Sequence, residues 1–307
     1  MSEQPHPTRS FHSAGVDTAE SPDPATRPGS SVPWQAPAAL GSYRLLERIG
    51  SGGMGYVYRA EDTRLGRVVA LKVMRPELAA RPELVERFLR EGRAQASVED
   101  AHVVPILAAD EEEGLPFLVM PLLKGQTVAD RLRLGAQPVA EALRIARGVA
   151  QGLAVAHAAG LVHRDIKPAN IWLDERGGVR LMDFGLAQLA SDLTHPGNVV
   201  GTPAFMPPEQ ARGDLVDERA DLFSLGKVLH ALLAGGVGKT LPPDLPPDLA
   251  GLCALLVHGD PAQRPPSAAW VAEELRRIGK RLKALPLLPF LAVALALALA
   301  AVFAFWR

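Results

Sequence analysis

Residues 163–170 hold side chains whose types and spacing suit the transfer of a phosphoryl group. Asp165 can accept a proton, Lys167 carries a positive charge two residues later, and Asn170 supplies a neutral ligand for a metal ion. A phosphoryl transfer site needs all three kinds of group close together. The segment therefore indicates a catalytic loop.

A second acidic motif, Asp183-Phe184-Gly185, begins thirteen residues after Asn170 and follows a strand-like run at 179–182. We expect Asp183 and Asn170 to bind Mg²⁺, because this cation prefers oxygen ligands, bridges phosphates and needs few ligands from the protein. Cysteine and histidine form no cluster in the sequence that would suit zinc. The two motifs together predict a magnesium-dependent site.

Residues 50–57 read GSGGMGYV, which fits the pattern G-x-G-x-x-G-x-V. Strand-like sequence lies on both sides of this glycine-rich segment, whereas a dinucleotide-binding glycine motif opens a helix. The context therefore favours a hairpin whose backbone closes over phosphates.

Lys72 lies in the apolar run 68–73, where an ammonium without an anionic partner would be costly to bury. A polyphosphate and the carboxylate of Glu91, on the following helical stretch, are the two partners that we expect. The alternative is that Lys72 reaches water at a strand edge and that Glu91 is a solvated helix charge.

The residues of these motifs must be positioned by the surrounding secondary structure, which is β-rich in the first part of the chain and helical in the second. Turn signals separate the β-rich runs, which predicts an antiparallel sheet with one charged helix beside it. Beyond residue 126 the apolar period becomes helical and ends at Gly160, a good helix stop. The strands are expected at 43–46, 56–60, 68–73, 103–108 and 117–120, and the helices at 82–97 and 139–159.

With these motifs in this order, residues 43 to about 278 resemble the eukaryotic-like protein kinase family in its bacterial Ser/Thr form. The resemblance implies an α+β, two-lobed fold, with a β-rich N-lobe at 41–123, an α-rich C-lobe at 124–278 and ATP between them. We therefore expect a protein kinase domain at 41–278.

The resemblance also assigns chemical roles. Asp165 would act as the base or would orient the substrate hydroxyl, and Lys167 would stabilise the γ-phosphate. Lys72, paired with Glu91, would hold the α- and β-phosphates. The sequence His-Arg-Asp-Ile-Lys-Pro around Lys167 is similar to the Ser/Thr branch, so the resemblance implies protein Ser/Thr acceptors.

The same resemblance implies an ATP pocket with Met120 as its gatekeeper. The carbonyl of Pro121 and the amide of Leu123 would bind the adenine edge. The expected nucleotide-binding set is Ile49, Gly50, Ser51, Gly52, Gly53, Met54, Gly55, Val57, Ala70, Lys72, Met120, Pro121, Leu123 and Asn170.

Three further residues have supporting roles by resemblance. Asp221 should hold the backbone of the catalytic loop, and Glu209 should pair with Arg264. Thr202 should hydrogen-bond the catalytic loop from the end of the activation segment.

Arg164, directly before Asp165, suggests control by a phosphate on the activation segment through an arginine–phosphate pair. Ser191 and Thr194 are the candidate acceptors, although exposed loop hydroxyls commonly have no such role.

The chain departs from the family in the segment 234–248, which is short and rich in glycine and proline where a longer connection with a further helix is usual. Pro207 also replaces an alanine. Because ATP binding does not use that helix, an active kinase that phosphorylates proteins, itself included, is the leading hypothesis. The alternatives are a nucleotide-binding pseudokinase scaffold and a small-molecule kinase.

Residues outside the domain predict a tail and an anchor. Residues 1–40 are rich in proline and serine and should be disordered. Residues 279–286 form a basic linker, and 287–306 carry no charge over a length that spans a bilayer as a helix. A buried soluble helix is the alternative for 287–306. Five cations at 276–283 against one after the segment predict a single-pass anchor with a cytoplasmic kinase domain.

Composition narrows the remaining classes. A net charge of −1 over 307 residues argues against nucleic-acid binding, which leaves a basic footprint. The single cysteine, Cys253, cannot form an internal disulfide and lies in an apolar run, so we expect core packing in a reducing compartment and not a reactive thiol.

Overall fold

The computed structural model describes residues 34, 36–184 and 203–284. The chain divides into two units, Met1–Pro37 and Ala38–Arg307, and the helices and strands of the described residues all lie in the second. The predicted disorder of residues 1–33 lies outside the described residues.

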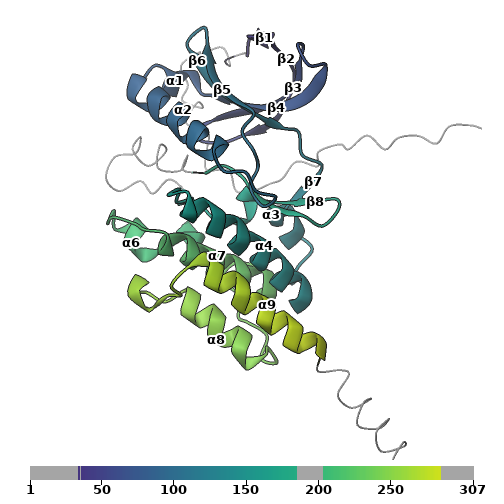
Figure 1. The fold of residues 1–307 in the computed structure, drawn as a ribbon, viewed down its shortest axis with the longest axis vertical. Coiled ribbons are helices and arrows are strands. Elements are labelled where there is room, and N and C mark those ends of the chain that lie inside the picture. The colour runs from purple at the N-terminus through teal and green to yellow at the C-terminus, as the bar shows by residue number, and fades with distance from the viewer. Residues whose placement is uncertain (1–33, 35, 185–202, 285–307) are drawn as a thin grey trace, which may run out of the picture. The chain divides into compact units, whose positions relative to one another are not determined.

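A six-stranded antiparallel sheet forms the N-lobe, with strand order β1-β2-β3-β4-β6-β5 (Figure 1). The predicted antiparallel sheet is confirmed, and four of its five predicted strands lie in β2, β3, β4 and β6. The strand bounds are β1 Ala39–Leu40, β2 Tyr43–Ser51, β3 Gly55–Asp62, β4 Arg67–Met74, β5 Ala108–Glu112 and β6 Leu115–Pro121.

One strand prediction and one disorder prediction are corrected. The run 103–108 is not a strand, since only Ala108 belongs to β5 and Val103 makes an isolated bridge to Leu181. Residues 39–40, placed in the disordered tail, form β1 because Leu40 is fully buried beneath the sheet edge. Antiparallel pairing with β2 and the burial of this leucine together order the short segment.

Helices α1 (Pro76–Ala79) and α2 (Pro82–Ala96) pack beside the sheet (Figure 1). Helix α2 matches the predicted helix and buries Leu84 and Phe88 on one face. Gly92 allows its close approach, because a Cβ there would come within 2.4 Å of Leu118. This contact fixes the helix that carries Glu91 against the sheet that carries Lys72.

Helices dominate the C-lobe, and α4 lies at its centre, packed on α7, α9 and β9. Helix α4 matches the second predicted helix, and ten of its residues are buried. The bounds are β7 Gly125–Thr127, α3 Val128–Leu132, α4 Val139–Ala158, η1 Pro168–Asn170, β8 Ile171–Asp174, β9 Val179–Leu181, η2 Pro203–Phe205, α6 Pro208–Ala211, α7 Arg219–Ala234, α8 Pro247–Leu256, η3 Pro261–Gln263 and α9 Ala268–Ala284.

The C-terminal helix α9 runs to Ala284, so most of the stretch predicted as a basic linker continues this helix. No helix in the described part of the chain is long and apolar enough to cross a membrane, and the predicted anchor at 287–306 lies outside that part. Cys253 is buried in α8, as expected for core packing. Burial raises the pKa of its thiol to about 12.

Candidate active site

The catalytic loop brings together the three groups that the sequence singled out. The Asn170 amide Nδ2 donates to the backbone oxygen of Asp165 at 2.9 Å and to its carboxylate Oδ2 at 2.8 Å. The Lys167 ammonium lies 2.7 Å from the same Oδ2. These contacts orient the Asp165 carboxylate. With 21% of its side chain exposed, it is still accessible to a substrate hydroxyl.

A buried carboxylate supports this loop. Asp221, fully buried on α7, accepts the backbone amides of His163 at 2.8 Å and of Arg164 at 2.7 Å. It also accepts His157 Nε2 at 2.8 Å. Arg164 has φ 63, a left-handed conformation that a non-glycine residue adopts only when its surroundings hold it. The predicted role of Asp221 is confirmed.

The loop is tied to the metal-binding motif through His163. Its Nε2 lies 2.9 Å from the carbonyl oxygen of Met182, the residue before Asp183. The carbonyl can only accept, so Nε2 carries the proton. The Phe184 ring is buried and lies 4.4 Å from the His163 ring, centroid to centroid. Asp165 and Asp183, far apart in sequence, are thereby held on neighbouring segments.

Lys72 is buried on β4, and its Nζ lies 2.7 Å from Asp183 Oδ1. Burial by itself raises the pKa of Asp183, but the positive charge and hydrogen bond of Lys72, helped by His163 and Lys167, outweigh it and hold the pKa below its ordinary value. Asp183 is therefore ionised at neutral pH and suited to bind a cation.

The predicted ion pair between Lys72 and Glu91 is wrong for this structure. Glu91 Oε1 accepts Arg87 Nε at 3.3 Å, while Oε2 is buried without a hydrogen-bond partner. Burial raises the pKa of Glu91, against the lowering effect of Arg87 and Arg164. Arg87 precedes Glu91 by one helical turn, a spacing that favours ion pairs and that the sequence already contained.

The nucleotide-binding residues predicted from the sequence lie on β2, β3, β4 and β6, on the turns beside these strands and, for Asn170, on η1. Strand register places Val57 opposite Lys72 and Ala70 opposite Met120. Ile49, Gly50 and Ser51 end β2, Gly52 and Gly53 form the turn, Met54 and Gly55 lead into β3, Met120 and Pro121 end β6, Leu123 follows β6, and Asn170 ends η1.

The turn of the glycine-rich segment is clamped by Arg75, which the sequence reasoning missed. Its amide donates to the Met54 carbonyl at 3.0 Å and its Nε to the Gly52 carbonyl at 3.0 Å. Its guanidinium also donates to the Tyr56 hydroxyl at 3.0 Å and lies over the Tyr56 ring. No local sequence signal links these residues, because they meet only when β3 and β4 pair.

The donors present fit a nucleotide with Mg²⁺. A Cβ added at Gly52 or Gly53 would meet no atom within 4 Å, so the backbone there faces open space that phosphates can approach. Because Asn170 directs its Nδ2 to Asp165, its amide oxygen is the atom that can bind a cation beside Asp183.

The comparisons with known proteins agree with this geometry. Residues 43–238 match the family of the protein kinase domain. The chain belongs to the protein kinase family.

This kinase is similar to curated bacterial relatives. It is 40% identical over 252 residues to a probable serine/threonine-protein kinase PknB of Bifidobacterium longum, covering 76% of this chain and 35% of the relative. It is 44% identical over 205 residues to the DNA damage-responsive serine/threonine-protein kinase RqkA of Deinococcus radiodurans, covering 64% of this chain and 30% of the relative. The kinase is thus a member of the bacterial eukaryotic-like Ser/Thr branch, and the matched region spans about a third of these relatives.

A solved structure shows the same fold. The kinase domain of PknI from Mycobacterium tuberculosis, as a double mutant, superposes with a TM-score of 0.66 at 28% identity, covering 78% of this chain and 97% of that chain. The predicted two-lobed, α+β kinase fold is confirmed.

The C-lobe of the kinase contains a buried ion pair that the sequence predicted. Arg264 donates two hydrogen bonds to Glu209, at 2.6 and 2.8 Å, and its guanidinium lies over the Phe223 ring. Three backbone carbonyls, of His258, Arg219 and Gly259, accept its remaining N–H groups. Every part of the guanidinium is therefore paired, which a buried cation requires.

Hydrogen bonds connect α6 to the catalytic loop and η2 to α7. Gln210 Nε2 donates to the Arg164 carbonyl at 3.0 Å, and Ser224 Oγ donates to the Phe205 carbonyl at 2.8 Å. The predicted contact of Thr202 and the candidate phosphorylation sites Ser191 and Thr194 lie outside the described residues, as does Gly185.

Proposed function

We propose that this chain is an active protein Ser/Thr kinase that transfers the γ-phosphate of ATP to protein hydroxyls, its own included. One observation carries the proposal: Lys167 and Asn170 converge on one carboxylate oxygen of Asp165, and Lys72 pairs with the ionised Asp183. A pseudokinase scaffold has no need of this complete set, so this alternative is not favoured.

Each residue has a defined task in the reaction. Asp165 accepts the hydrogen bond of the acceptor hydroxyl and orients its oxygen, and Lys167 offsets negative charge next to it. Asn170 and Asp183 would hold Mg²⁺, which would neutralise charge on the phosphates. Lys72 gives the phosphates a buried cation, and the Arg75 clamp keeps the glycine-rich turn in place.

Transfer from labelled ATP tests the proposal. With Mg²⁺ present, label is expected on serine or threonine of the full chain and of a generic acceptor protein. Removal of Mg²⁺ with EDTA should abolish the labelling, because Asp183 and Asn170 are proposed to act through the cation. ATP binding without transfer to either acceptor would contradict the proposal and support the scaffold reading.

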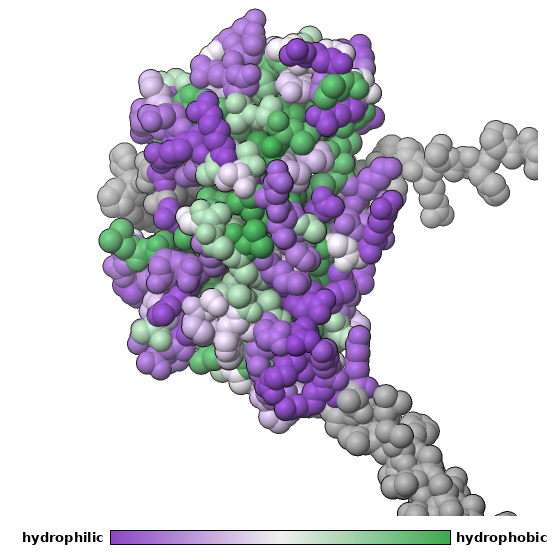
Figure 2. Space-filling view, in the orientation of Figure 1, coloured by the Kyte–Doolittle hydropathy of each residue, from purple (hydrophilic) through white to green (hydrophobic). Residues whose placement is uncertain are grey.

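We also propose that residues 287–306 anchor the kinase in a membrane, with the kinase domain on the cytoplasmic side. The support is twenty uncharged residues directly after a helix that ends in Arg281 and Lys283. Hydrophilic side chains gather around the end of α9 (Figure 2). Confinement to a membrane would raise the effective concentration of neighbouring copies and favour autophosphorylation by self-association.

Alkaline extraction of membranes tests the anchor. The full chain is expected to stay in the membrane pellet, whereas the double variant Leu295→Arg and Leu297→Arg should move to the supernatant, since each arginine at the centre of a span costs roughly 2.5–3.5 kcal/mol. The double variant Leu295→Ala and Leu297→Ala is the matched control and should stay in the pellet. A wild-type chain that is released by alkali would refute the anchor.

A further inference from the structure

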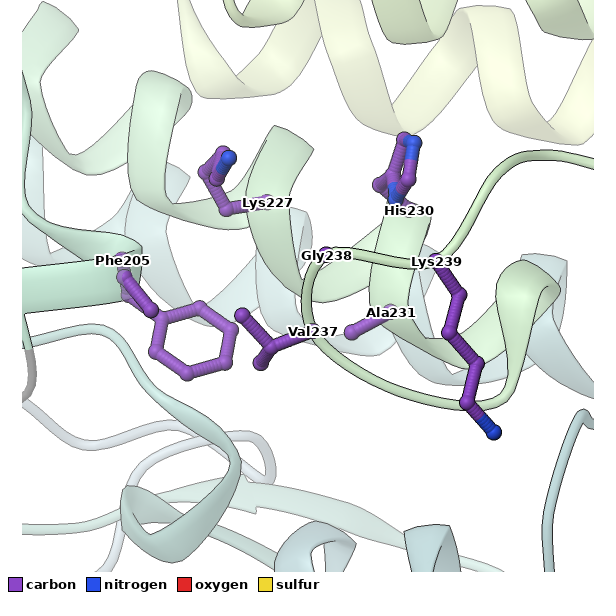
Figure 3. Close-up of a pocket in the computed structure, with 8 residues that line it drawn as sticks. Phe205, Lys227, His230, Ala231, Val237, Gly238 and Lys239 are labelled. Carbon is purple, nitrogen blue, oxygen red and sulfur yellow. The ribbon is translucent and has the colours of Figure 1, made fainter.

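A pocket of about 260 Å³ opens in the C-lobe between η2, α7 and the connection that follows α7 (Figure 3). Lys227 and His230 line it from α7, Phe205 from η2, and Val237 and Lys239 from the connection. None of these residues belongs to the ATP site described above. The pocket is therefore a separate feature of the C-lobe.

The pocket is electropositive. Lys227 and His230 are one helical turn apart and so share a face of α7. No acidic side chain lines the pocket, and neither lysine nor the histidine takes part in an ion pair within the described residues. Burial and the nearby charge of Lys227 lower the pKa of His230. Two lysines thus line this pocket, Lys227 from α7 and Lys239 from the connection, without a carboxylate among the lining residues.

An apolar wall borders the charged side. The Phe205 and Val237 side chains point toward one another in Figure 3, and Val237 is 54% exposed. Phe205 is fixed by the hydrogen bond of its carbonyl from Ser224 on α7. A ligand that combines one anionic group with one apolar group would satisfy both sides of the pocket.

The short connection builds the pocket. Helix α7 ends at Ala234 and α8 begins at Pro247, which leaves twelve residues of turns without a helix. Gly235 and Gly238 have φ of 76° and 74°, a region that favours glycine, and these turns lead Val237 and Lys239 to the wall of α7. The short connection at 234–248, in which a helix usual for the family is missing, therefore also forms one wall of this pocket.

The pocket lies within reach of a peptide held at the catalytic loop. Asp221, which binds the catalytic-loop backbone, is on the same helix six residues before Lys227 and nine before His230. At 1.5 Å per residue these positions lie roughly 9 and 14 Å along α7 from that contact. An extended peptide covers about 3.3–3.6 Å per residue, so a side chain about three to five residues from the acceptor reaches the pocket.

We propose that this pocket binds an acidic side chain of the protein substrate, about three to five residues from the acceptor hydroxyl, with an apolar neighbour against Phe205 and Val237. The inference rests on the proposed protein kinase activity and adds a substrate preference to it. Charge complementarity decides the occupant, since a basic peptide would meet two unpaired ammonium groups.

Peptides with one serine acceptor test the preference on the full chain. Glutamate, phosphoserine, glutamine or lysine is placed three, four or five residues to either side of the serine. The glutamate peptide at one of these positions is expected to exceed its glutamine counterpart in kcat/KM by about fivefold, mainly through KM, as for a partly exposed ion pair. A phosphoserine peptide preferred above glutamate would show that the pocket is built for phosphate and would overturn the assignment to a carboxylate.

Charge reversal supplies the control. Lys239→Glu should abolish the preference for glutamate and favour the lysine peptide, and because this side chain is exposed the variant should melt at the wild-type temperature. Lys283→Ala, an exposed lysine on α9, is the matched control and should keep the preference. Equal kcat/KM for glutamate and glutamine peptides in the wild type would refute the pocket.

A binding measurement separates this inference from the proposed activity. Anisotropy of a labelled glutamate peptide with the full-length Asp165→Asn variant needs no turnover. Binding that is lost in Asp165→Asn combined with Lys239→Glu supports the pocket even where no peptide is phosphorylated, in which case only the proposed activity fails. Equal binding of glutamate and glutamine peptides overturns the pocket alone.

Discussion

We expect Asp165→Asn to lower kcat for phosphoryl transfer by at least about 10²-fold, with little change in ATP affinity. The amide has the shape of the carboxylate but cannot accept a proton, and it removes the charge that Lys167 and Asn170 converge on. The N-lobe residues that are proposed to contact ATP do not include Asp165. The measurement is single-turnover and steady-state transfer from labelled ATP at saturating Mg²⁺.

Asp214→Asn is the matched control for this variant. Asp214 is exposed and pairs only with the nearby Arg212 within the described residues, so its amide variant should retain wild-type kcat. Equal rates for Asp165→Asn and the wild type would remove Asp165 from the reaction. The convergent loop would then have to be explained as a structural element.

Arg264→Met is expected to lower the free energy of unfolding by about 3–5 kcal/mol, because it leaves the Glu209 carboxylate buried without its bidentate partner. Urea unfolding of the full chain, followed by tryptophan fluorescence, measures the loss. Replacing both partners, Arg264→Leu with Glu209→Leu, should cost less than Arg264→Met alone, since neither charge remains buried. A loss below about 1 kcal/mol for Arg264→Met would contradict the assignment.

The pH dependence gives a second readout of the same pair. Burial by itself raises the pKa of Glu209, but the hydrogen bonds and charge of Arg264 outweigh it, so the pKa lies below the ordinary value of 4.5. The pair therefore stabilises the fold above pH 4.5, and this stabilisation is lost as the pH falls through the lowered pKa. In Arg264→Met the raising effect of burial on this pKa is opposed only by a backbone hydrogen bond and the charge of Arg212, so acidification should relieve the variant and narrow its difference from the wild type.

The partner of Lys72 illustrates how a local signal can mislead. Glu91 and Asp183 both have the right charge, and the sequence favoured Glu91 because it lies on the helical stretch that follows Lys72. In the structure Glu91 forms an ion pair with Arg87, one turn away on the same helix, and Lys72 forms an ion pair with Asp183. Which acid Lys72 meets depends on how α2 docks on the sheet and how the segment at Asp183 lies beneath it, and neither is encoded in spacing.

The sequence by itself determined the chemistry and most of the elements. Aspartate, lysine and asparagine within 163–170 are brought together by local chain geometry, and the apolar periods of β4 and α4 predict those elements because burial is repeated along one segment. The Arg264 and Glu209 pair followed from the family resemblance.

Only the tertiary structure decided contacts between segments that no period connects. The Arg75 clamp requires β3 and β4 to pair, and the cationic pocket requires η2, α7 and a twelve-residue connection to meet. Spacing along the chain constrains neighbours within one element, whereas long-range contacts depend on how whole faces pack. That packing placed two lysines, neither in an ion pair within the described residues, around a pocket that Phe205 also lines, where the sequence had shown only a shortened loop.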